Sequence, residues 1–133
     1  MYVDIAALVR EALLDSGCDP SLLSNFDSHS TIALDFNDLP SIYISSQEED
    51  IWLWSRIAEF NENTLAQRAP VLLNELMQGV EFIRGEQFHL SQNDGYLELK
   101  ALLNPECLTS GPKFAVALSG FFERLERFVE VMQ

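Results

Sequence analysis

The sequence has few basic residues and no long apolar segment, and both absences limit what it can do. Lysine and arginine number 8 among 133 residues, against 21 aspartates and glutamates, so the formal net charge is -13. Such a chain repels phosphate backbones and anionic membrane surfaces, which argues against nucleic acid as a partner. No run approaches the roughly 18 apolar residues of a membrane-spanning helix, and the acidic N-terminal segment does not fit a secretory signal. We therefore expect a cytoplasmic protein with no membrane insertion.

Cysteine is scarce, and the spacings of metal and catalytic sites are missing. The two cysteines, Cys18 and Cys107, are far apart, which fits reduced thiols better than a disulfide framework. Together with His29 and His89 they show no CxxC or HExxH spacing. The six glycines form neither GxGxxG nor GxxxxGK[ST], and no nucleophile has an evident base. We expect no enzymatic activity, no catalytic residue, no metal and no cofactor.

The sequence does contain enough apolar material for one globular domain. Hydrophobic residues make up 47% and aromatic residues 11% of the chain, a composition typical of folded proteins. A chain of this length buries roughly two thirds of the surface that its unfolded form exposes. No repeat or linker divides it, so residues 1–133 are expected to form a single domain.

The hydrophobic periodicity predicts three helices and five strands in the order α-β-β-β-α-β-β-α. The helices are expected at residues 4–17, at 64–80 and from 110 onward, the first capped by Asp4 and the last by Ser110. The strands are expected at residues 30–36, 41–45, 51–57, 80–90 and 96–103, the fourth with a bulge near Gly85. The first three strands should form an antiparallel meander. Asn93-Asp94-Gly95 is typical of a hairpin turn between the last two.

The helix expected at 64–80 has a wider apolar surface than one packed layer uses. Its apolar face consists of Leu65, Ala69, Leu72, Leu73, Leu76 and Val80, widened by Ala66 and Met77. Val71 lies on the other side, among polar residues that include Glu75. We expect part of this surface to pack on its own domain and the rest on a partner.

Pro70 complicates the start of this central helix, because proline removes a backbone donor. Either Thr64 caps a helix that kinks at Pro70, with Gln67 completing a capping box, or the regular helix starts near Arg68. Gly79 is expected to end it in both cases.

Two further sets of apolar residues are candidates for a binding surface. Val3, Ala7 and Leu14 lie on the outer side of the first helix, whose inner face is formed by Ile5, Leu8, Val9, Ala12 and Leu13. Tyr43, Trp52 and Trp54 share one face of the predicted meander. The alternative is that the helices cover both faces of the sheet completely.

Six segments carry a resemblance to a known family. They are GCDPSL at 17–22, DSHSTI at 27–32, LPSI at 39–42, the W-x-W of Trp52 and Trp54, LELKALL at 97–103 and GPKFAVALSGFF at 111–122. In this order they resemble the class I type III secretion chaperones, and within them the multi-effector InvB/SpaK kind. The match covers almost the whole chain.

The resemblance implies an α/β (α+β) fold with a twisted antiparallel five-stranded sheet, three helices and no enzymatic activity. It also implies a homodimer joined through the second helix, here Leu65, Ala69, Leu72, Leu73, Leu76 and Met77. The dimer would bind the N-terminal segments of secreted effector proteins in extended form and keep them soluble and competent for secretion. Components of the secretion apparatus are a further class of expected partner. Pro70 departs from the unbroken second helix of the family.

The residues leave two other functions open. One is a small-ligand or enzymatic α+β domain with a pocket between the sheet and the last helix, lined by the phenylalanines. The other is a dimeric regulator that binds one folded protein partner.

Overall fold

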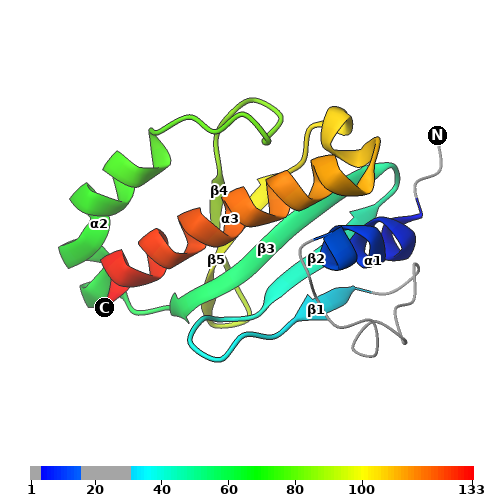
Figure 1. The fold of residues 1–133 in the computed structure, drawn as a ribbon. Helices are drawn as coiled ribbons and strands as arrows, with labels where there is room; N and C mark the ends of the chain where they lie inside the picture. Colours follow the sequence, from blue (N-terminus) through cyan, green and yellow to red (C-terminus); the bar gives the residue numbers. More distant parts are fainter. Residues whose placement is uncertain (1–3, 16–30) are drawn as a thin grey trace.

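The computed structural model describes residues 4–15 and 31–133 and contains the predicted order of three helices and five strands (Figure 1). The helices are α1 (Ile5–Asp15), α2 (Glu62–Leu76) and α3 (Gly111–Met132), with a short 3-10 turn, η2 (Pro105–Leu108), before α3. The strands are β1 (Ile32–Leu34), β2 (Ile42–Gln47), β3 (Asp50–Glu59), β4 (His89–Asn93) and β5 (Tyr96–Leu102).

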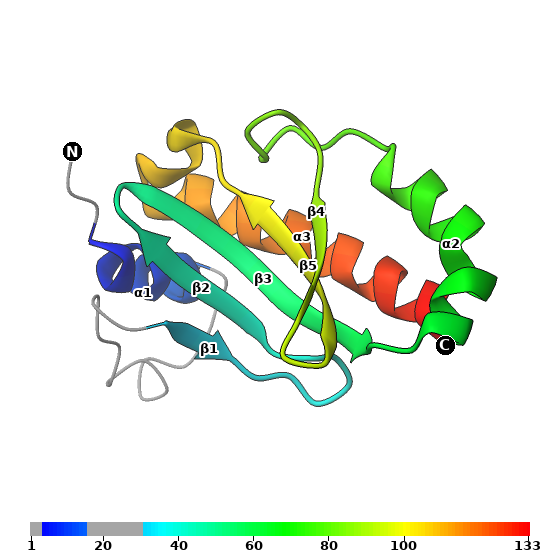
Figure 2. The ribbon, with the colours of Figure 1, turned by 180° about the vertical axis from the view of Figure 1, so that it is seen from behind.

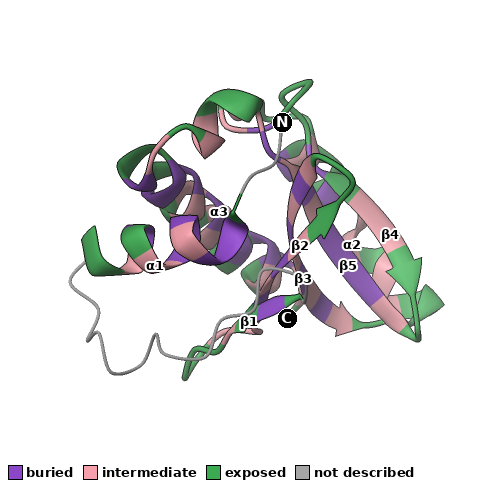
Figure 3. Cartoon of the chain, turned by 90° about the vertical axis from the view of Figure 1, so that its right-hand side faces the viewer, coloured by how far each residue is buried: buried purple, intermediate pink, exposed green. Residues whose placement is uncertain are grey.

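The five strands form one twisted sheet in the order β1-β2-β3-β5-β4, and every neighbouring pair is antiparallel (Figure 2). The central strand β3 is the longest, and its register against β5 shifts between Arg56 and Ala58. Helices α1 and α3 lie on one side of the sheet (Figure 3). Helix α2 lies beyond the end of β3, beside the C-terminal half of α3. None of the described helices therefore covers the other side of the sheet (Figure 2).

The core lies between the inner face of the sheet and α3. Phe114, Phe121 and Phe128 recur every seventh residue on α3 and are fully buried, so they form a single stripe. They face the alternate residues of the strands, such as Leu53 of β3 and Leu99 of β5, which are also fully buried. The alternation predicted for these strands is confirmed.

Both predicted caps of the flanking helices are present. Asp4 Oδ1 accepts a hydrogen bond from the Ala7 N–H at 3.1 Å, and Ser110 Oγ accepts one from the Lys113 N–H at 3.3 Å. At Gly111 an added Cβ would lie 2.5 Å from the Cβ of Glu11. Glycine at this position thus permits the close contact between the start of α3 and α1.

Both predicted starts of α2 are wrong. The helix begins at Glu62 and is capped by Asn61, whose side chain accepts from the N–H groups of Asn63 and Thr64 at 2.9 and 3.1 Å. Asparagine is a strong N-cap residue, so the helix starts just after Asn61, about one turn earlier than a helix capped by Thr64 would start. Pro70 lies inside the helix on its exposed side, where water can satisfy the carbonyl that proline leaves unpaired.

The predicted end of α2 and the predicted course of β4 also need correction. Helix α2 ends at Leu76, so Gly79 follows the helix rather than terminating it. Strand β4 begins only at His89, because Gly85 and Glu86 both have positive φ (82° and 68°) and turn the chain. The expected bulge near Gly85 is a turn, closed by a 2.9 Å hydrogen bond from the Val80 N–H to the Glu86 carbonyl.

The hairpin between β4 and β5 is confirmed. Asp94 and Gly95 have φ of 53° and 81°, the pair of positive values that a tight two-residue turn requires. Strand β1 is shorter than predicted, with three residues in place of residues 30–36.

Candidate protein-binding surfaces

The outer face of the sheet carries the predicted aromatic residues. Trp54 stacks on Tyr43 with ring centroids 4.3 Å apart, and its indole N–H donates to Ser45 Oγ at 2.9 Å. Trp52 meets the ring of His89 edge-on at 5.3 Å. The described helices all lie away from this face (Figure 2), so these rings are covered by one another and not by a helix. The alternative in which helices cover both faces is therefore wrong for the described residues.

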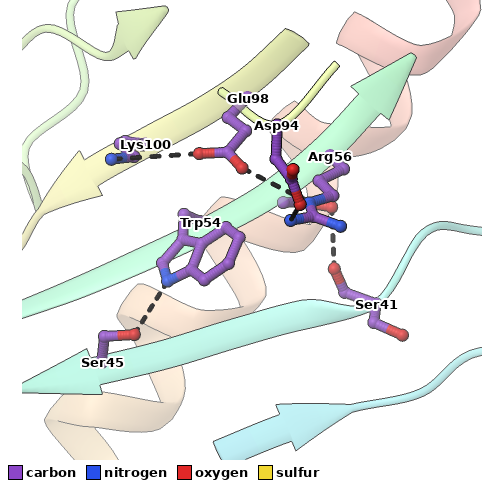
Figure 4. Close-up of polar contacts among 8 residues, drawn as sticks. Ser41, Ser45, Trp54, Arg56, Asp94, Glu98 and Lys100 are labelled. Carbon is purple, nitrogen blue, oxygen red and sulfur yellow. Dashed lines mark hydrogen bonds and ion pairs between the residues drawn. The ribbon is translucent and has the colours of Figure 1, made fainter. Parts of the chain in front are cut away.

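A cluster of charges lies beside these rings on the same face (Figure 4). The side chain of Glu98 is 1% exposed and lies between Arg56, with Nε 3.4 Å from one carboxylate oxygen, and Lys100, with Nζ 3.9 Å from the other. Arg56 also lies 4.6 Å above the ring of Tyr96. The two cations are thus engaged with a buried carboxylate, which needs such compensation.

A first groove lies beside α1 and includes one of the three residues predicted there. Its cavity of about 830 Å³ is lined by Asp4, Ala7, Leu8, Glu11, Glu49, Asp50, Arg84, Pro105, Leu108 and Thr109. Leu14 is 44% exposed but is not among the lining residues. Val3 lies outside the described residues. We call this cavity the α1 groove.

A second groove, which we call the α3 groove, lies between the sheet and α3, where the ligand-binding alternative placed a pocket lined by phenylalanines. It consists of two cavities of about 540 and 370 Å³ that share Phe36, Phe122 and Glu126. Its floor is apolar and comprises Leu13, Leu34, Phe36, Leu39, Ile42, Leu118, Phe122 and Val129. The rings of Phe36 and Phe122 meet edge-on at 5.1 Å. The sequence did not identify Phe36 or Phe122 individually as binding residues.

The predicted dimer residues of α2 divide into three groups by exposure. Leu72 is 2% exposed and belongs to the protein's own core, so it has no surface to offer a partner. Leu65, Ala69 and Leu76 are half-buried. Leu73 and Met77 are 56% and 64% exposed.

Two further residues extend this exposed group. Ala66 and Pro70 lie on the same side of α2 as Leu73 and Met77 and are exposed as well. We call these four residues the α2 stripe. Val71, 45% exposed, lies off the stripe, as predicted.

Glu75, which the sequence places among the polar residues of α2, is nevertheless buried, with 4% of its surface exposed. Its carboxylate accepts from Arg124 Nη2 at 2.8 Å and from Arg127 Nε at 2.9 Å, and Arg124 also donates to the Glu75 carbonyl at 3.0 Å. The hydrogen bond from Arg127 lowers the pKa of Glu75 against the opposing effect of burial, with Arg124 adding to the lowering. The same bond raises the pKa of Arg127. This cluster holds α2 on α3 with the α2 stripe facing outward.

The described residues offer little for catalysis. Within 4–15 and 31–133, no three histidine, cysteine, aspartate or glutamate side chains gather as metal ligands. Burial, and after it the charge of Glu106, raises the pKa of the Cys107 thiol, which makes it a poor nucleophile. Cys18 and His29 lie outside the described residues, so the absence of a zinc site stays a prediction. No described helix combines the length and hydropathy needed to cross a membrane.

Comparison with solved structures shows where this fold occurs. The chain is similar to a chain of the ExsC-ExsE complex, with a TM-score of 0.61 and 14% identity over 95% of this chain and 88% of the other. It is also similar to a chain of the heterodimeric ExoU-SpcU complex from the type III secretion system of Pseudomonas aeruginosa, with a TM-score of 0.57 and 19% identity over 92% and 96% of the two chains. The predicted fold is confirmed.

Comparison of sequences identifies closer relatives. The surface presentation of antigens protein SpaK of Salmonella typhimurium strain LT2 is 49% identical over 127 residues, which cover 96% of this chain and 94% of that protein. SpaK of Salmonella typhi matches equally well. The Invasion protein B family model matches residues 17–94, more than half of the chain. With this match, the identity to SpaK and the fold described above, the chain belongs to the Invasion protein B family.

Proposed function

We propose that this protein is a class I type III secretion chaperone that binds the N-terminal segments of several effector proteins. It keeps them soluble, partly non-globular and competent for secretion. The observation that carries the proposal is the amount of apolar surface the described chain leaves uncovered. This surface comprises two grooves, the aromatic sheet face and the α2 stripe, and no catalytic group converges on any of them. Family membership supports the proposal, as does the fold shared with a protein of a type III secretion complex.

The proposed mechanism needs neither ATP nor a catalytic residue. A disordered client segment places apolar side chains in the grooves, which removes them from water without folding the client. Among the described strands, the edge strand β1 pairs with β2 alone, and its other side would accept a client strand. Contacts that are mostly apolar and backbone-directed tolerate several client sequences.

The chaperone acts as a homodimer joined through the α2 stripe. A two-fold axis brings the same patch of both copies together. Leu73 and Met77 would be covered by the partner copy, with Ala69 at the margin, while Glu75 holds the helix from behind. Leu72 takes no part, because it is already buried in its own protomer.

Co-expression with secreted proteins of the same host tests the proposal. Each secreted protein is divided into its N-terminal segment and its folded remainder, and both halves are tested for co-purification with the chaperone. We expect the N-terminal segments to co-purify and to remain sensitive to protease outside the protected stretch. Capture of one folded remainder alone would favour a regulator of a folded partner. Binding of a small molecule with no protein client would favour a ligand-binding domain.

A further inference from the structure

The α3 groove combines an apolar floor with a rim whose charged residues are all negative. Its charged lining residues are Asp38, Glu123, Glu126 and Glu130, and the lining includes no lysine or arginine. Glu130 lies 3.7 Å from Arg127. Within residues 4–15 and 31–133, Asp38, Glu123 and Glu126 have no ion-pair partner. Like charges gathered around an apolar floor repel one another until a cation joins them.

The charged and apolar rows of the groove run side by side along α3. Glu123, Glu126 and Glu130 recur at intervals of three and four residues, as residues on one side of a helix do. Phe122 and Val129 line the same cavity next to this row, and Asp38 faces it from the loop between β1 and β2. A ligand lying along the groove therefore meets apolar and acidic groups together.

The α1 groove repeats the pattern at a separate place in the fold. Four carboxylates, Asp4, Glu11, Glu49 and Asp50, line it together with one arginine. That arginine, Arg84, already pairs with Asp50 at 3.0 Å. The combination of apolar floor and negative rim is thus a property of both grooves.

We propose that the α3 groove selects client segments in which apolar anchors are flanked by lysine or arginine. This inference rests on the proposed chaperone function and adds the chemistry of the client. The floor around Phe36 and Phe122 holds the anchors, and the basic side chains pair with Glu123, Glu126 and Asp38. Because the pairs lie at the rim, they are exposed to salt and contribute specificity more than affinity.

Three labelled peptides test this selection. In each, leucine and phenylalanine alternate with one spacer residue, which is lysine in the first peptide, glutamine in the second and glutamate in the third. We expect the lysine peptide to bind most tightly and its advantage over the glutamine peptide to shrink as salt rises from about 0.05 to 0.5 M. Fluorescence anisotropy gives each Kd.

Charge reversal tests whether the preference for the lysine peptide arises in the α3 groove. The double variant Glu123→Lys/Glu126→Lys should weaken binding of the lysine peptide by about three- to tenfold and strengthen binding of the glutamate peptide. The control, Glu59→Lys/Glu81→Lys, changes the net charge equally at two exposed residues that line neither groove. We expect the control to keep the order of affinities of the parent protein. Circular dichroism checks that both variants fold.

Each other outcome contradicts either this inference alone or the proposed chaperone function as well. If both double variants shift the affinities equally, the preference comes from net charge and the inference is wrong. If all three peptides bind equally and effector segments still co-purify, the inference fails and the chaperone function stands. If no peptide and no effector segment binds, the proposed function fails with it. If the groove variant changes only the dimer mass, a second copy occupies the groove and the inference is again wrong.

Discussion

Helices α2 and α3 are both amphipathic, yet they use their apolar faces in opposite ways. On α3, Phe114, Phe121 and Phe128 are fully buried against the sheet. On α2, Leu73 and Met77 are more than half exposed. The buried residues of α2 are Leu72 and the charged Glu75. Helix α3 is therefore held by apolar packing, whereas α2 is held in large part by an ion cluster. An apolar face in the sequence therefore shows that a helix can pack there, but it does not show which segment or partner it packs against.

The largest expected effect is on assembly. Leu73→Asp places a carboxylate in the α2 stripe, and covering it with a second copy would cost several kcal/mol. We expect the parent protein to sediment as a dimer at micromolar concentration and this variant to sediment as a monomer or to aggregate. Val116→Asp, at a 72% exposed site on α3, is the matched control and should stay dimeric. A well-folded monomeric parent would contradict the α2 interface.

The second test concerns the packing of α3. Phe121→Ala removes a fully buried ring from the core and should lower the free energy of unfolding by about 3 to 5 kcal/mol. Urea denaturation followed by circular dichroism measures it. At protein concentrations low enough for the chain to be monomeric, Leu73→Ala on α2 should cost far less, because that side chain is 56% exposed in the protomer. Equal losses would mean that the two helices do not differ as described.

The third test breaks the attachment of α2. Glu75→Ala leaves Arg124, whose side chain is 20% exposed, without its carboxylate. We expect a loss of about 3 kcal/mol in the free energy of unfolding. The loss should be accompanied by faster hydrogen exchange in α2 than in α3. Unchanged exchange in α2 would show that apolar contacts alone hold this helix.

The pH dependence of stability sharpens the same comparison. The folded state lowers the pKa of Glu75 below its ordinary value of 4.5. Its contribution is therefore complete above that value and is lost as pH falls through the lower, folded pKa. Between about pH 5 and pH 3, the parent should lose stability more steeply than Glu75→Gln. Parallel curves for the two proteins would contradict the lowered pKa.

The smallest expected effect is on client binding at α1. Leu14 is 44% exposed, and Leu14→Glu should weaken binding of an effector segment by roughly 1 to 3 kcal/mol. Melting temperature and dimer mass should stay nearly unchanged. Val116→Glu controls for the added charge. Unfolding of the Leu14 variant would make the residue part of the core, and unaltered binding would place the client elsewhere.

Short-range rules predicted most of the fold. The caps at Asp4 and Ser110, the turn at Asp94 and Gly95, and the alternation along β3 depend on neighbours in the sequence. The errors at the start of α2 and in residues 80–88 have local causes too, since Asn61 is a better cap than Thr64 and two positive φ values interrupt the expected strand.

The binding surfaces were predicted less completely, because exposure depends on distant segments. Tyr43 and Trp54 were placed correctly on one face, since strand alternation determines the face. The α3 groove was anticipated only as the phenylalanine-lined pocket of the ligand-binding alternative, because nothing near Phe36 in sequence indicates that its ring meets Phe122 at the edge of the core. Whether Ala7 and Leu14 contact a client stays a prediction.

The order of elements, the acidic character and the family resemblance follow from residue identity and short-range periodicity, so they could be predicted from the amino-acid sequence. Which apolar residues remain exposed depends on how distant segments pack. Leu72 and Leu73 are adjacent in sequence, yet the first is buried and the second is exposed, because α3 lies on one side of α2 alone. Whether a residue is buried depends on which distant segment packs against its side of the helix, and the packing of the whole chain determines which segment that is.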